Sequence, residues 1–537
     1  MKNFKKIMAL VLVFVIMVPS FAMAAEVNYG TAKNVIMMIP DGMNIEASTM
    51  ARWMTDDFKL VMDSMATGLV KTNNANTPIA DSAPAGTAMA TGYKTQSPYV
   101  GTYPSVAGMP GAEFDKSKAM MPIATIVEGA ERAGKATGII STSNVQHATP
   151  ADFTSHNPNR NNYEDLAEQQ VYQGMEVVLG AGSKHLDPVV RKDGEDLVGV
   201  IKELGYDYIT TPEAMKASTG DKLWGMFAES AMAYDIDRDP AKEPSLAEMT
   251  EKALEVLAKN DKGFFLMVEG SKVDWAAHAN DPVGVNSDVL AFDKAVKIAK
   301  DFADKHGDTV LIIASDHGTG GLTVGHRQIS SGYDKAPLES FTHIIKDAKL
   351  TGEGVAAKLD ENRTNIAAVM NEAYGIADLT EAELKSIKDA KDVQGAVGTV
   401  VSNRSNIGWT TGGHVGGDVA LYCYSTDSNA KVLSGTVHNS DIGKYVSGLL
   451  QLDLNSLTSK LYNVARPGFE AKGATIEFNF AEDTNHEVKV VKGEQEIILP
   501  ISKNYALVNG EKVDIGGLTI FNTKTIYVPQ GAFELVK

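Results

Sequence analysis

The chain has 537 residues, of which 44% are hydrophobic and 22% charged, and its formal net charge is −18 at pH 7. This length exceeds what one hydrophobic core usually serves, so we expect one large domain with insertions or with a smaller domain attached. The acidic balance argues against a surface that binds nucleic acid, and a phosphate-bearing ligand would need local positive charge from arginine or bound metal.

The N-terminus has the pattern of a secretory signal peptide over residues 1–24. Lysines lie near its start, an apolar run covers residues 7–18, and a small-x-small cleavage pattern covers residues 22–24. The alternative of a membrane anchor is weaker, because the run is shorter than the roughly 20 residues that span a bilayer. We therefore expect export, to a secreted, periplasmic or cell-surface location, of a mature chain that starts near Ala25 and has no membrane span.

Residues 79–92, IADSAPAGTAMATG, place Ser82 at the start of a run of small helix-forming residues. A serine at this point either caps a helix or serves as a nucleophile whose activating group lies elsewhere in the chain. The stretch alone leaves both interpretations open.

Three continuous apolar runs, at residues 35–39, 264–268 and 310–314, each stop at polar residues followed closely by glycine. Runs of this length are typical of buried strands in a parallel sheet. Helical patterns at 245–260 and 287–307 alternate with them. The alternation predicts an α/β fold with a doubly wound, mostly parallel sheet flanked by helices.

In such sheets ligands gather at the carboxyl ends of the strands. The polar residues that follow the three runs are therefore expected at one edge of the sheet: they are Asp41, Glu269, Asp316 and His317.

The strand rhythm is interrupted at residues 325–405, a polar and helical stretch that we interpret as an insertion in a catalytic domain of residues 25–468. From about residue 470 the chain consists of short alternating or β-branched runs, with Asn509-Gly510 as a hairpin turn signal. Residues 469–537 are thus expected to form a separate small β module, most simply a spacer or a surface-contact domain.

Asp274 and His278 are four residues apart, which places them on one face of a helix where both can bind one ion. Such a pair by itself more often belongs to a solvated helix face. His414, among glycines, and the pair Asp316-His317 supply further ligands. Carboxylate and imidazole without thiolate suit catalytic zinc.

One ion would be bound by Asp274, His278 and His414, and another by Asp316, His317 and Asp41. Two zinc ions about 4 Å apart can stabilise both the attacking and the leaving oxygen of a displacement at phosphorus.

Six segments, in chain order, resemble the motifs of the alkaline phosphatase family. They are NVIMMIPDGM (34–43), ADSAPAGTAMATG (80–92), QHATPADFTSHNPNR (146–160), MVEGSKVDWAAH (267–278), ASDHG (314–318) and GGHVGGDVALY (412–422). Each motif is weak alone, but together they are specific and extend over nearly all of the mature chain before the β module. The resemblance implies a bacterial, secreted type of alkaline phosphatase that hydrolyses phosphate monoesters through a phosphoserine intermediate at a site with two zinc ions and one magnesium ion.

The resemblance also implies the role of each residue. Ser82 becomes the nucleophile, activated by the zinc of Asp41, Asp316 and His317, and its helix start offers backbone N–H groups to phosphate. The zinc of Asp274, His278 and His414 serves the leaving oxygen and then the attacking hydroxide. Arg160 matches the guanidinium that clamps phosphate. The magnesium ligands match Asp41, Thr149 and Glu269.

This chain departs from the better-known patterns at the third metal site. The enterobacterial branch has aspartate and lysine where this chain has His147 and Trp275, and animal members have histidine at both places. His147 and Trp275 are expected as neighbours of the third metal, and cobalt or zinc competes with magnesium for it, because imidazole suits those ions better. The segment around Ser82 shares Pro84 with the sulfatase signature S-x-P-x-R, but Gly86 stands where that signature has arginine. The segment therefore does not indicate a sulfatase.

Two other functions are weighed. A phosphodiesterase of the same superfamily shares the two-zinc core, but Arg160 favours a monoester because it clamps two free phosphoryl oxygens. An inactive exported protein that binds metal or phosphate is disfavoured, because Ser82 and all the inferred ligands are present. Small phosphomonoesters are the expected substrates, and a homodimer is the default that the resemblance implies.

Overall fold

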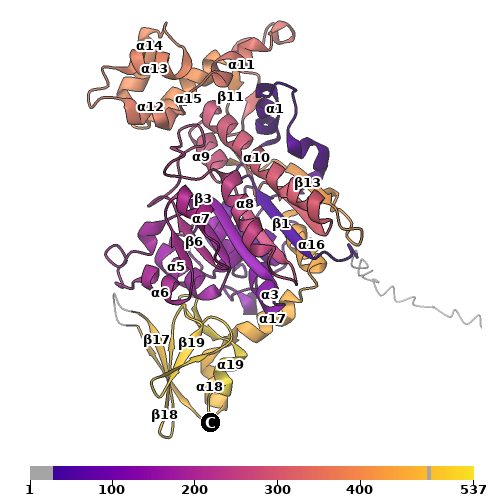
Figure 1. Cartoon of the computed structure of the whole chain (residues 1–537), viewed down its shortest axis with the longest axis vertical. Coiled ribbons are helices and arrows are strands. Elements are labelled where there is room, and N and C mark those ends of the chain that lie inside the picture. The colour runs from indigo at the N-terminus through magenta and orange to yellow at the C-terminus, as the bar shows by residue number, and fades with distance from the viewer. Residues whose placement is uncertain (1–27, 481–484) are drawn as a thin grey trace, which may run out of the picture.

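The computed structural model of the chain describes residues 28–480 and 485–537 (Figure 1). The signal peptide expected at residues 1–24 lies outside them. Within these two ranges, none of the helices combines the length and the apolar character that crossing a membrane requires.

In the described part of the chain, ten strands form a central sheet in the order β14-β2-β13-β8-β1-β7-β3-β4-β6-β5. All neighbouring pairs are parallel except those of β13, which runs antiparallel to β2 and β8. The fold is therefore the mostly parallel α/β sheet that the sequence predicts. The strands are β1 (Asn34–Ile39), β2 (Ala66–Lys71), β3 (Ala136–Asn144), β4 (Val177–Ala181), β5 (Asp207–Ile209), β6 (Leu223–Met226), β7 (Phe264–Glu269), β8 (Thr309–Ala314), β13 (Val419–Ser425) and β14 (Gly435–His438).

The three apolar runs of the sequence are β1, β7 and β8, and they lie side by side at the centre of the sheet. β1 pairs in parallel with both neighbours, so that Val35 lies opposite Phe265 on one side and Val310 on the other. Every residue of the three strands is buried. Because the strands are parallel, the polar residues that follow them meet at one edge of the sheet.

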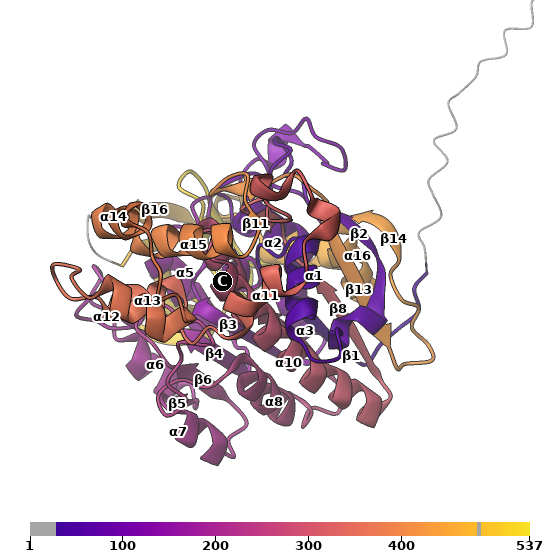
Figure 2. The same cartoon turned by 90° about the horizontal axis from the view of Figure 1, so that it is seen from above.

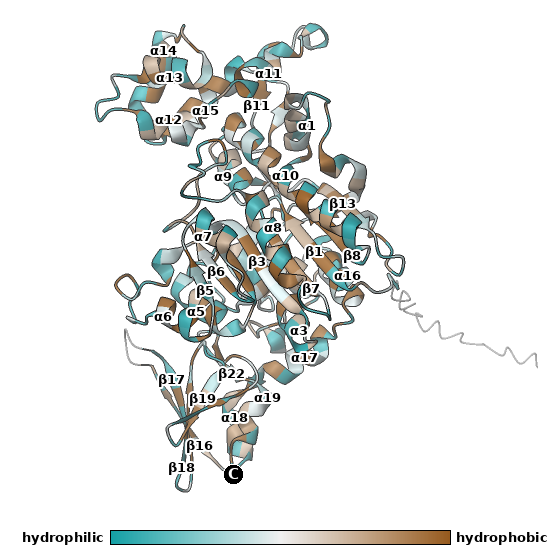
Figure 3. Cartoon of the chain, viewed as in Figure 1, coloured by the Kyte–Doolittle hydropathy of each residue, from teal (hydrophilic) through white to brown (hydrophobic). Residues whose placement is uncertain are grey.

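Helices cover both faces of the sheet, which explains why the strands are apolar throughout. Ile36 and Met38 pack into a cluster with α8 (Leu246–Leu257) and α10 (Pro282–His306). Val35 and Met37 point the other way, into a cluster with α3 (Ile126–Arg132) and α16 (Asn439–Leu449). Hydrophobic residues follow the central strands, while the outer faces of the helices are hydrophilic (Figure 3).

Helix α10 begins earlier than the pattern at 287–307 predicts. Asp281 caps it by accepting hydrogen bonds from the backbone N–H groups of Val283 and Gly284, and Pro282 occupies its first turn. The helix ends at Gly307, which has a φ of 75°. The predicted C-terminal glycine is confirmed, and the early start reflects a cap that hydrophobic periodicity does not reveal.

The helical insertion gathers at one end of the molecule, where Figure 2 shows it from above. Its helices are α11 (Glu339–Lys346), α12 (Gly352–Lys358), α13 (Ile366–Tyr374), α14 (Glu381–Asp389) and α15 (Val393–Arg404). Two short strands, β10 (Thr323–Val324) and β11 (Ile407–Gly408), pair antiparallel at its base. The predicted helical character is confirmed, while the division of the chain into domains stays a prediction.

The C-terminal β-rich part lies at the opposite end from the insertion (Figure 1). Apart from the gap at residues 481–484, it forms an antiparallel sheet in the order β16-β17-β18-β19-β20. Asn509 and Gly510, with φ of 50° and 90°, connect β19 to β20 and confirm the predicted hairpin turn. The strands are β16 (Thr475–Asn479), β17 (Glu487–Lys492), β18 (Gln495–Pro500), β19 (Tyr505–Val508) and β20 (Glu511–Asp514).

A smaller sheet, in the order β15-β22-β21, adjoins these strands. It consists of β15 (Asn463–Val464), β22 (Ile526–Val528) and β21 (Ile520–Phe521), and it is flanked by α17 (Leu454–Leu461), α18 (Ala465–Ala471) and α19 (Gln530–Glu534).

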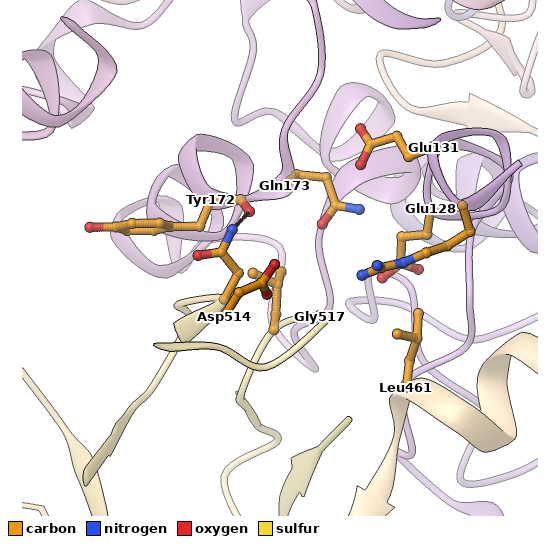
Figure 4. A pocket seen from close by; sticks show the side chains of 10 residues that line it. Glu128, Glu131, Tyr172, Gln173, Leu461, Asp514 and Gly517 are labelled. Carbon is orange, nitrogen blue, oxygen red and sulfur yellow. Dashed lines mark hydrogen bonds between the residues drawn. The ribbon is translucent and has the colours of Figure 1, made fainter. Parts of the chain in front are cut away.

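The β module contacts the sheet domain through an apolar cluster, in which Leu518, Ile520 and Tyr527 pack with Ala124 and Tyr172, and through polar and charged side chains. Lys503 Nζ lies 3.3 Å from Glu168 Oε1 and 2.7 Å from Glu195 Oε1. Asn504 Nδ2 donates to the Tyr172 carbonyl at 2.9 Å. A polar cavity of about 220 Å³ lies beside these contacts, between α3 and α5 (Tyr163–Gln173) on one side and the module on the other (Figure 4). Burial raises the pKa of Glu131, in its wall, to about 8.

Candidate active site

The carboxyl ends of the three central strands bring four predicted site residues together. Asp41 follows β1, Glu269 is the last residue of β7, and Asp316 and His317 follow β8. All four side chains are fully buried. Neighbours of this edge come from α2 (Ser82–Thr91), α4 (Ala148–Thr154), α9 (Lys272–His278) and the two-residue strand β12 (His414–Val415).

Ser82 is the first residue of α2, and Asp81 occupies the cap position before it. The structure thus removes the interpretation of Ser82 as the helix cap. The helix is buried along its whole length because its small residues allow α4 and α16 to approach closely. At Gly86, for example, a Cβ atom would lie only 2.3 Å from Oδ2 of Asp152, which is on α4. Ser82 Oγ lies 3.1 Å from His317 Nε2.

The first candidate metal cluster consists of Asp41, Asp316 and His317. His317 Nε2 lies 3.1 Å from Asp316 Oδ2 and 3.7 Å from Asp41 Oδ1. Neither carboxylate oxygen of Asp41 has a hydrogen-bond partner among the residues that the structure describes. Burial, together with the nearby carboxylates of Asp316, Asp274 and Glu269, raises the pKa of Asp41 well above its usual range. Buried, unpaired and mutually repelling carboxylates are what a bound cation would stabilise, so the donor set fits a metal.

The second candidate cluster consists of Asp274, His278 and His414. Asp274 and His278 face the same way on α9, as their spacing predicts, and His278 Nε2 lies 3.3 Å from Asp274 Oδ2. His414 comes from β12, which pairs with β9 (Gly318–Thr319), and its Nε2 lies 3.1 Å from Nε2 of His278.

Backbone carbonyls orient both histidines of this cluster. His278 Nδ1 donates to the Gly412 carbonyl, and His414 Nδ1 donates to the Ala80 carbonyl, each at 2.7 Å. With the proton on Nδ1, each Nε2 presents a lone pair to the centre of the cluster, which is the arrangement that metal-binding histidines adopt. Thr319 Oγ1 donates to Asp274 Oδ1 at 2.6 Å and holds the carboxylate in place.

The three residues expected as magnesium ligands bring oxygen atoms only. Glu269 Oε2 accepts a hydrogen bond from Ser141 Oγ at 2.6 Å. The other carboxylate oxygen of Glu269 and the hydroxyl of Thr149, on α4, are buried without a partner in the ranges 28–480 and 485–537. Burial raises the pKa of Glu269 to about 7. Buried oxygen donors of this kind, with those of Asp41, suit a hard cation.

Arg160 lies in the loop after α4, and both ends of its guanidinium are held. Nη1 donates to Asp81 Oδ1 at 2.5 Å, and Nη2 donates to His147 Nε2 at 3.2 Å. Ser97 Oγ donates to the other oxygen of Asp81 at 2.7 Å. Although Asp81 is largely buried, Arg160 and Ser97 hold the pKa of its carboxyl below its usual range.

His147 precedes α4 and is neutral, because burial and the positive charge of Arg160 lower its pKa to about 3. Its ring meets that of Trp275 edge-on, with centroids 5.9 Å apart. His147 Nδ1 is buried and unpaired as far as the structure describes the chain. The sequence places His147 only near the third metal, whereas the structure also shows it as a partner of Arg160.

Two residues of the site were missed by the sequence reasoning. Asp81, which orients Arg160, could have been found from its place directly before Ser82. Thr319 gives no local signal, because its contact with Asp274 depends on the approach of β9 to α9. A further carboxylate cluster of Glu168, Asp193 and Glu195 lies within reach of one ion, but Lys503 and Arg191 already pair with it.

Comparison with known proteins shows the family of the chain. The family model described as alkaline phosphatase matches residues 32–452. Alkaline phosphatase 3 of Bacillus subtilis is 34% identical over 451 residues, which cover 80% of this chain and 91% of the relative. The repressible alkaline phosphatase of Saccharomyces cerevisiae is 29% identical over 538 residues, covering 89% and 92%.

Solved structures give the same result. The crystal structure of Thermus thermophilus alkaline phosphatase superposes with a TM-score of 0.70 at 28% identity, covering 81% of this chain and 95% of the other. The cold-active enzyme of a Shewanella species gives a TM-score of 0.66 at 29% identity, covering 78% and 99%. The matched residues 32–452 contain both candidate metal clusters and Ser82, and end before the β module. The chain therefore belongs to the alkaline phosphatase family, whose members are metal-dependent enzymes that hydrolyse phosphate monoesters.

Proposed function

We propose that this protein hydrolyses phosphate monoesters through a phosphoserine intermediate formed on Ser82. The observation that carries the proposal is the position of Ser82 Oγ, at the N-terminus of a buried helix and 3.1 Å from His317 Nε2. Its hydroxyl thus adjoins a cluster of histidine and carboxylate that fits a metal.

Three ions are proposed. Asp41, Asp316 and His317 would hold one zinc, and Asp274, His278 and His414 would hold the other. Asp41, Thr149 and Glu269 would hold magnesium, with cobalt or zinc as its competitors beside His147 and Trp275. Bound at these places, the cations would favour ionisation of a hydroxyl near neutral pH and neutralise charge that develops on oxygen.

Ser82 forms the new bond in the first half of the reaction. Its Oγ loses a proton and attacks phosphorus, and the bond from phosphorus to the ester oxygen breaks as the alcohol leaves. The backbone N–H groups in the first turn of α2 point toward the phosphoryl group and suit its negative charge. Water then attacks the phosphoserine, which releases inorganic phosphate and restores Ser82.

Arg160 selects the substrate class. Asp81 and His147 hold the guanidinium at its two ends, so that its fork is oriented before phosphate arrives. Two parallel hydrogen bonds to free phosphoryl oxygens favour a monoester over a diester. This contact weighs against the phosphodiesterase alternative.

Ser82→Ala tests the proposal. Turnover of p-nitrophenyl phosphate should fall by several orders of magnitude, while zinc content stays at two per chain because three side chains still hold each ion. Labelled phosphate, trapped by acid quenching, should appear on serine in the wild type and not in the variant. Near-normal activity in the variant would show the mechanism to be wrong.

Two further results would select the alternatives. Faster turnover of bis-p-nitrophenyl phosphate than of the monoester would favour the phosphodiesterase. No turnover of either ester by the zinc-loaded wild type would favour the inactive binding protein.

We also propose export through residues 1–24, division into a catalytic domain and a β module near residue 468, and a homodimer. N-terminal sequencing of protein recovered outside the cytoplasm should begin near Ala25. Light scattering of the purified mature chain measures the oligomeric state.

A further inference from the structure

We infer that Asn280 is a positioning residue that ties the insertion helix α15 to the loop carrying His414, and so sets the spacing between His278 and His414. The inference rests on the proposed function, in which these two histidines hold one zinc ion with Asp274. It assigns to the helical insertion a part in building the metal site.

Asn280 lies just after α9 in the left-handed region, with a φ of 51°. Asparagine tolerates this conformation better than most residues that have a side chain. Its Nδ2 donates to the Ala277 carbonyl at 2.9 Å and to the Thr411 carbonyl at 3.0 Å. The next carbonyl along that loop, of Gly412, accepts from His278 Nδ1. Two successive loop residues are thus held by the end of α9, immediately before His414.

The insertion reaches the same residue from the other side. Ser402 Oγ, on α15, donates to the Asn280 carbonyl at 3.3 Å and accepts from Trp409 Nε1 at 2.9 Å. Gly398 lets α15 lie directly on this carbonyl, because a Cβ atom there would be 2.7 Å from it. Trp409 in turn begins the loop that leads to His414.

The loop is also seated on a glycine turn. Gly320 has a φ of 75°, and a Cβ atom there would lie 2.6 Å from the Trp409 ring. Its N–H donates to the Gly413 carbonyl at 2.8 Å. The contacts thus close into one circuit next to His414: α15 contacts Asn280, Asn280 contacts the loop of residues 409–413, and Trp409 of that loop contacts α15.

This circuit bears mainly on the cluster of Asp274, His278 and His414, although the His414 ring also stacks on that of His317 with centroids 3.7 Å apart. His414 belongs to a strand of only two residues and follows two glycines, so beyond its pairing with β9 and its bond to the Ala80 carbonyl its position relative to α9 depends on the circuit. Asp41, Asp316 and His317 are instead fully buried at the ends of β1 and β8. Loss of the Asn280 side chain should therefore loosen only the zinc of Asp274, His278 and His414.

Asn280→Gly isolates the side chain, because glycine adopts the same left-handed backbone without strain. The measurement is zinc release from the full, zinc-loaded chain to a chromophoric chelator. We expect one of the two zinc ions to leave at least about tenfold faster than in the wild type, because His414 loses its orientation, and the other to leave at the wild-type rate. Visible spectra of the cobalt-substituted protein should show a change at one site only.

Asn509→Gly is the matched control. Asn509 is also left-handed, with a φ of 50°, and its side chain also hydrogen-bonds to the backbone, here by accepting from the Glu496 N–H, but it lies in the hairpin of the β module. Both zinc ions should leave this variant at wild-type rates. Ser402→Ala removes the contact from α15 alone and should speed release of the same single ion, to a smaller extent, so the test does not depend on the stability of Asn280→Gly.

His278→Ala separates failure of the inference from failure of the proposed function. It should abolish tight binding of one zinc ion; two tightly bound ions in this variant would show that the ligand assignment itself is wrong. If His278→Ala loses one ion while Asn280→Gly and Ser402→Ala release both at wild-type rates, the inference is overturned and the proposed function stands. Equal acceleration of both ions in Asn280→Gly would also overturn it.

Discussion

Replacing Arg160 with alanine removes the proposed phosphate clamp without adding a charge. The guanidinium is held by Asp81 at 2.5 Å and by His147 at 3.2 Å, and its side chain is only 15% exposed. The fork is thus oriented in advance, and little of its binding energy is spent on ordering the side chain.

The size of the effect follows from the hydrogen bonds that alanine cannot make to phosphate. A hydrogen bond to a charged group contributes about 1.5–3 kcal/mol, and a fork on phosphate makes two of them. Their loss corresponds to about 3–6 kcal/mol, or a factor of about 150 to 25,000 in kcat/KM for a monoester. The free energy of unfolding should change by only about 1 kcal/mol, because Asp81 is 27% exposed and keeps its bond from Ser97.

The assay compares kcat/KM for p-nitrophenyl phosphate with that for its methyl diester. The monoester value should fall by that factor, and the diester value should fall less, because the diester has fewer free oxygens to clamp. Arg52→Ala is the control: Arg52 forms a similar two-point contact with Asp63, at 2.9 and 2.7 Å, on α1 (Ile45–Met54), and its loss should leave both values unchanged. A monoester kcat/KM within about threefold of wild type, or equal losses on both esters, would refute the assigned role of Arg160.

Three other changes have defined outcomes. His147→Asp should lower the magnesium concentration that half-activates the zinc-loaded enzyme, because a carboxylate suits magnesium better than a neutral imidazole does; equal half-activation in both proteins would leave His147 as a packed histidine. Truncation after residue 468 should leave a soluble, active enzyme with a lower Tm, because every inferred ligand is kept while the ion pairs of Lys503 are removed; loss of zinc would make the module part of the catalytic core. In the folded state the Glu131 carboxyl keeps its proton up to about pH 8, whereas in the unfolded state it loses the proton near its ordinary, lower pKa. The free energy of unfolding therefore falls as pH rises between those two values. The advantage in Tm of Glu131→Gln over wild type should therefore grow from pH 5 to pH 8, and a constant difference in Tm would contradict the raised pKa.

Local patterns in the sequence determined much of the site at the carboxyl ends of the central strands. The apolar runs of β1, β7 and β8 fit only a sheet that is covered on both faces, and the residues that end them are therefore brought together. The four-residue spacing of Asp274 and His278 fits one helix face, and Asn509-Gly510 fits a hairpin turn. These features were predicted because each depends on periodicity or on the backbone preference of a few adjacent residues.

Tertiary structure alone decided which distant segments meet. The position of β13, antiparallel between β2 and β8, and the approach of His414 to His278 across 136 residues depend on packing and pairing between segments that carry no local mark of each other. The same is true of the clamp that Asp81 and His147 form on Arg160. Contacts between such distant segments are determined by the burial and hydrogen bonding of the whole fold. No short stretch of sequence carries that information.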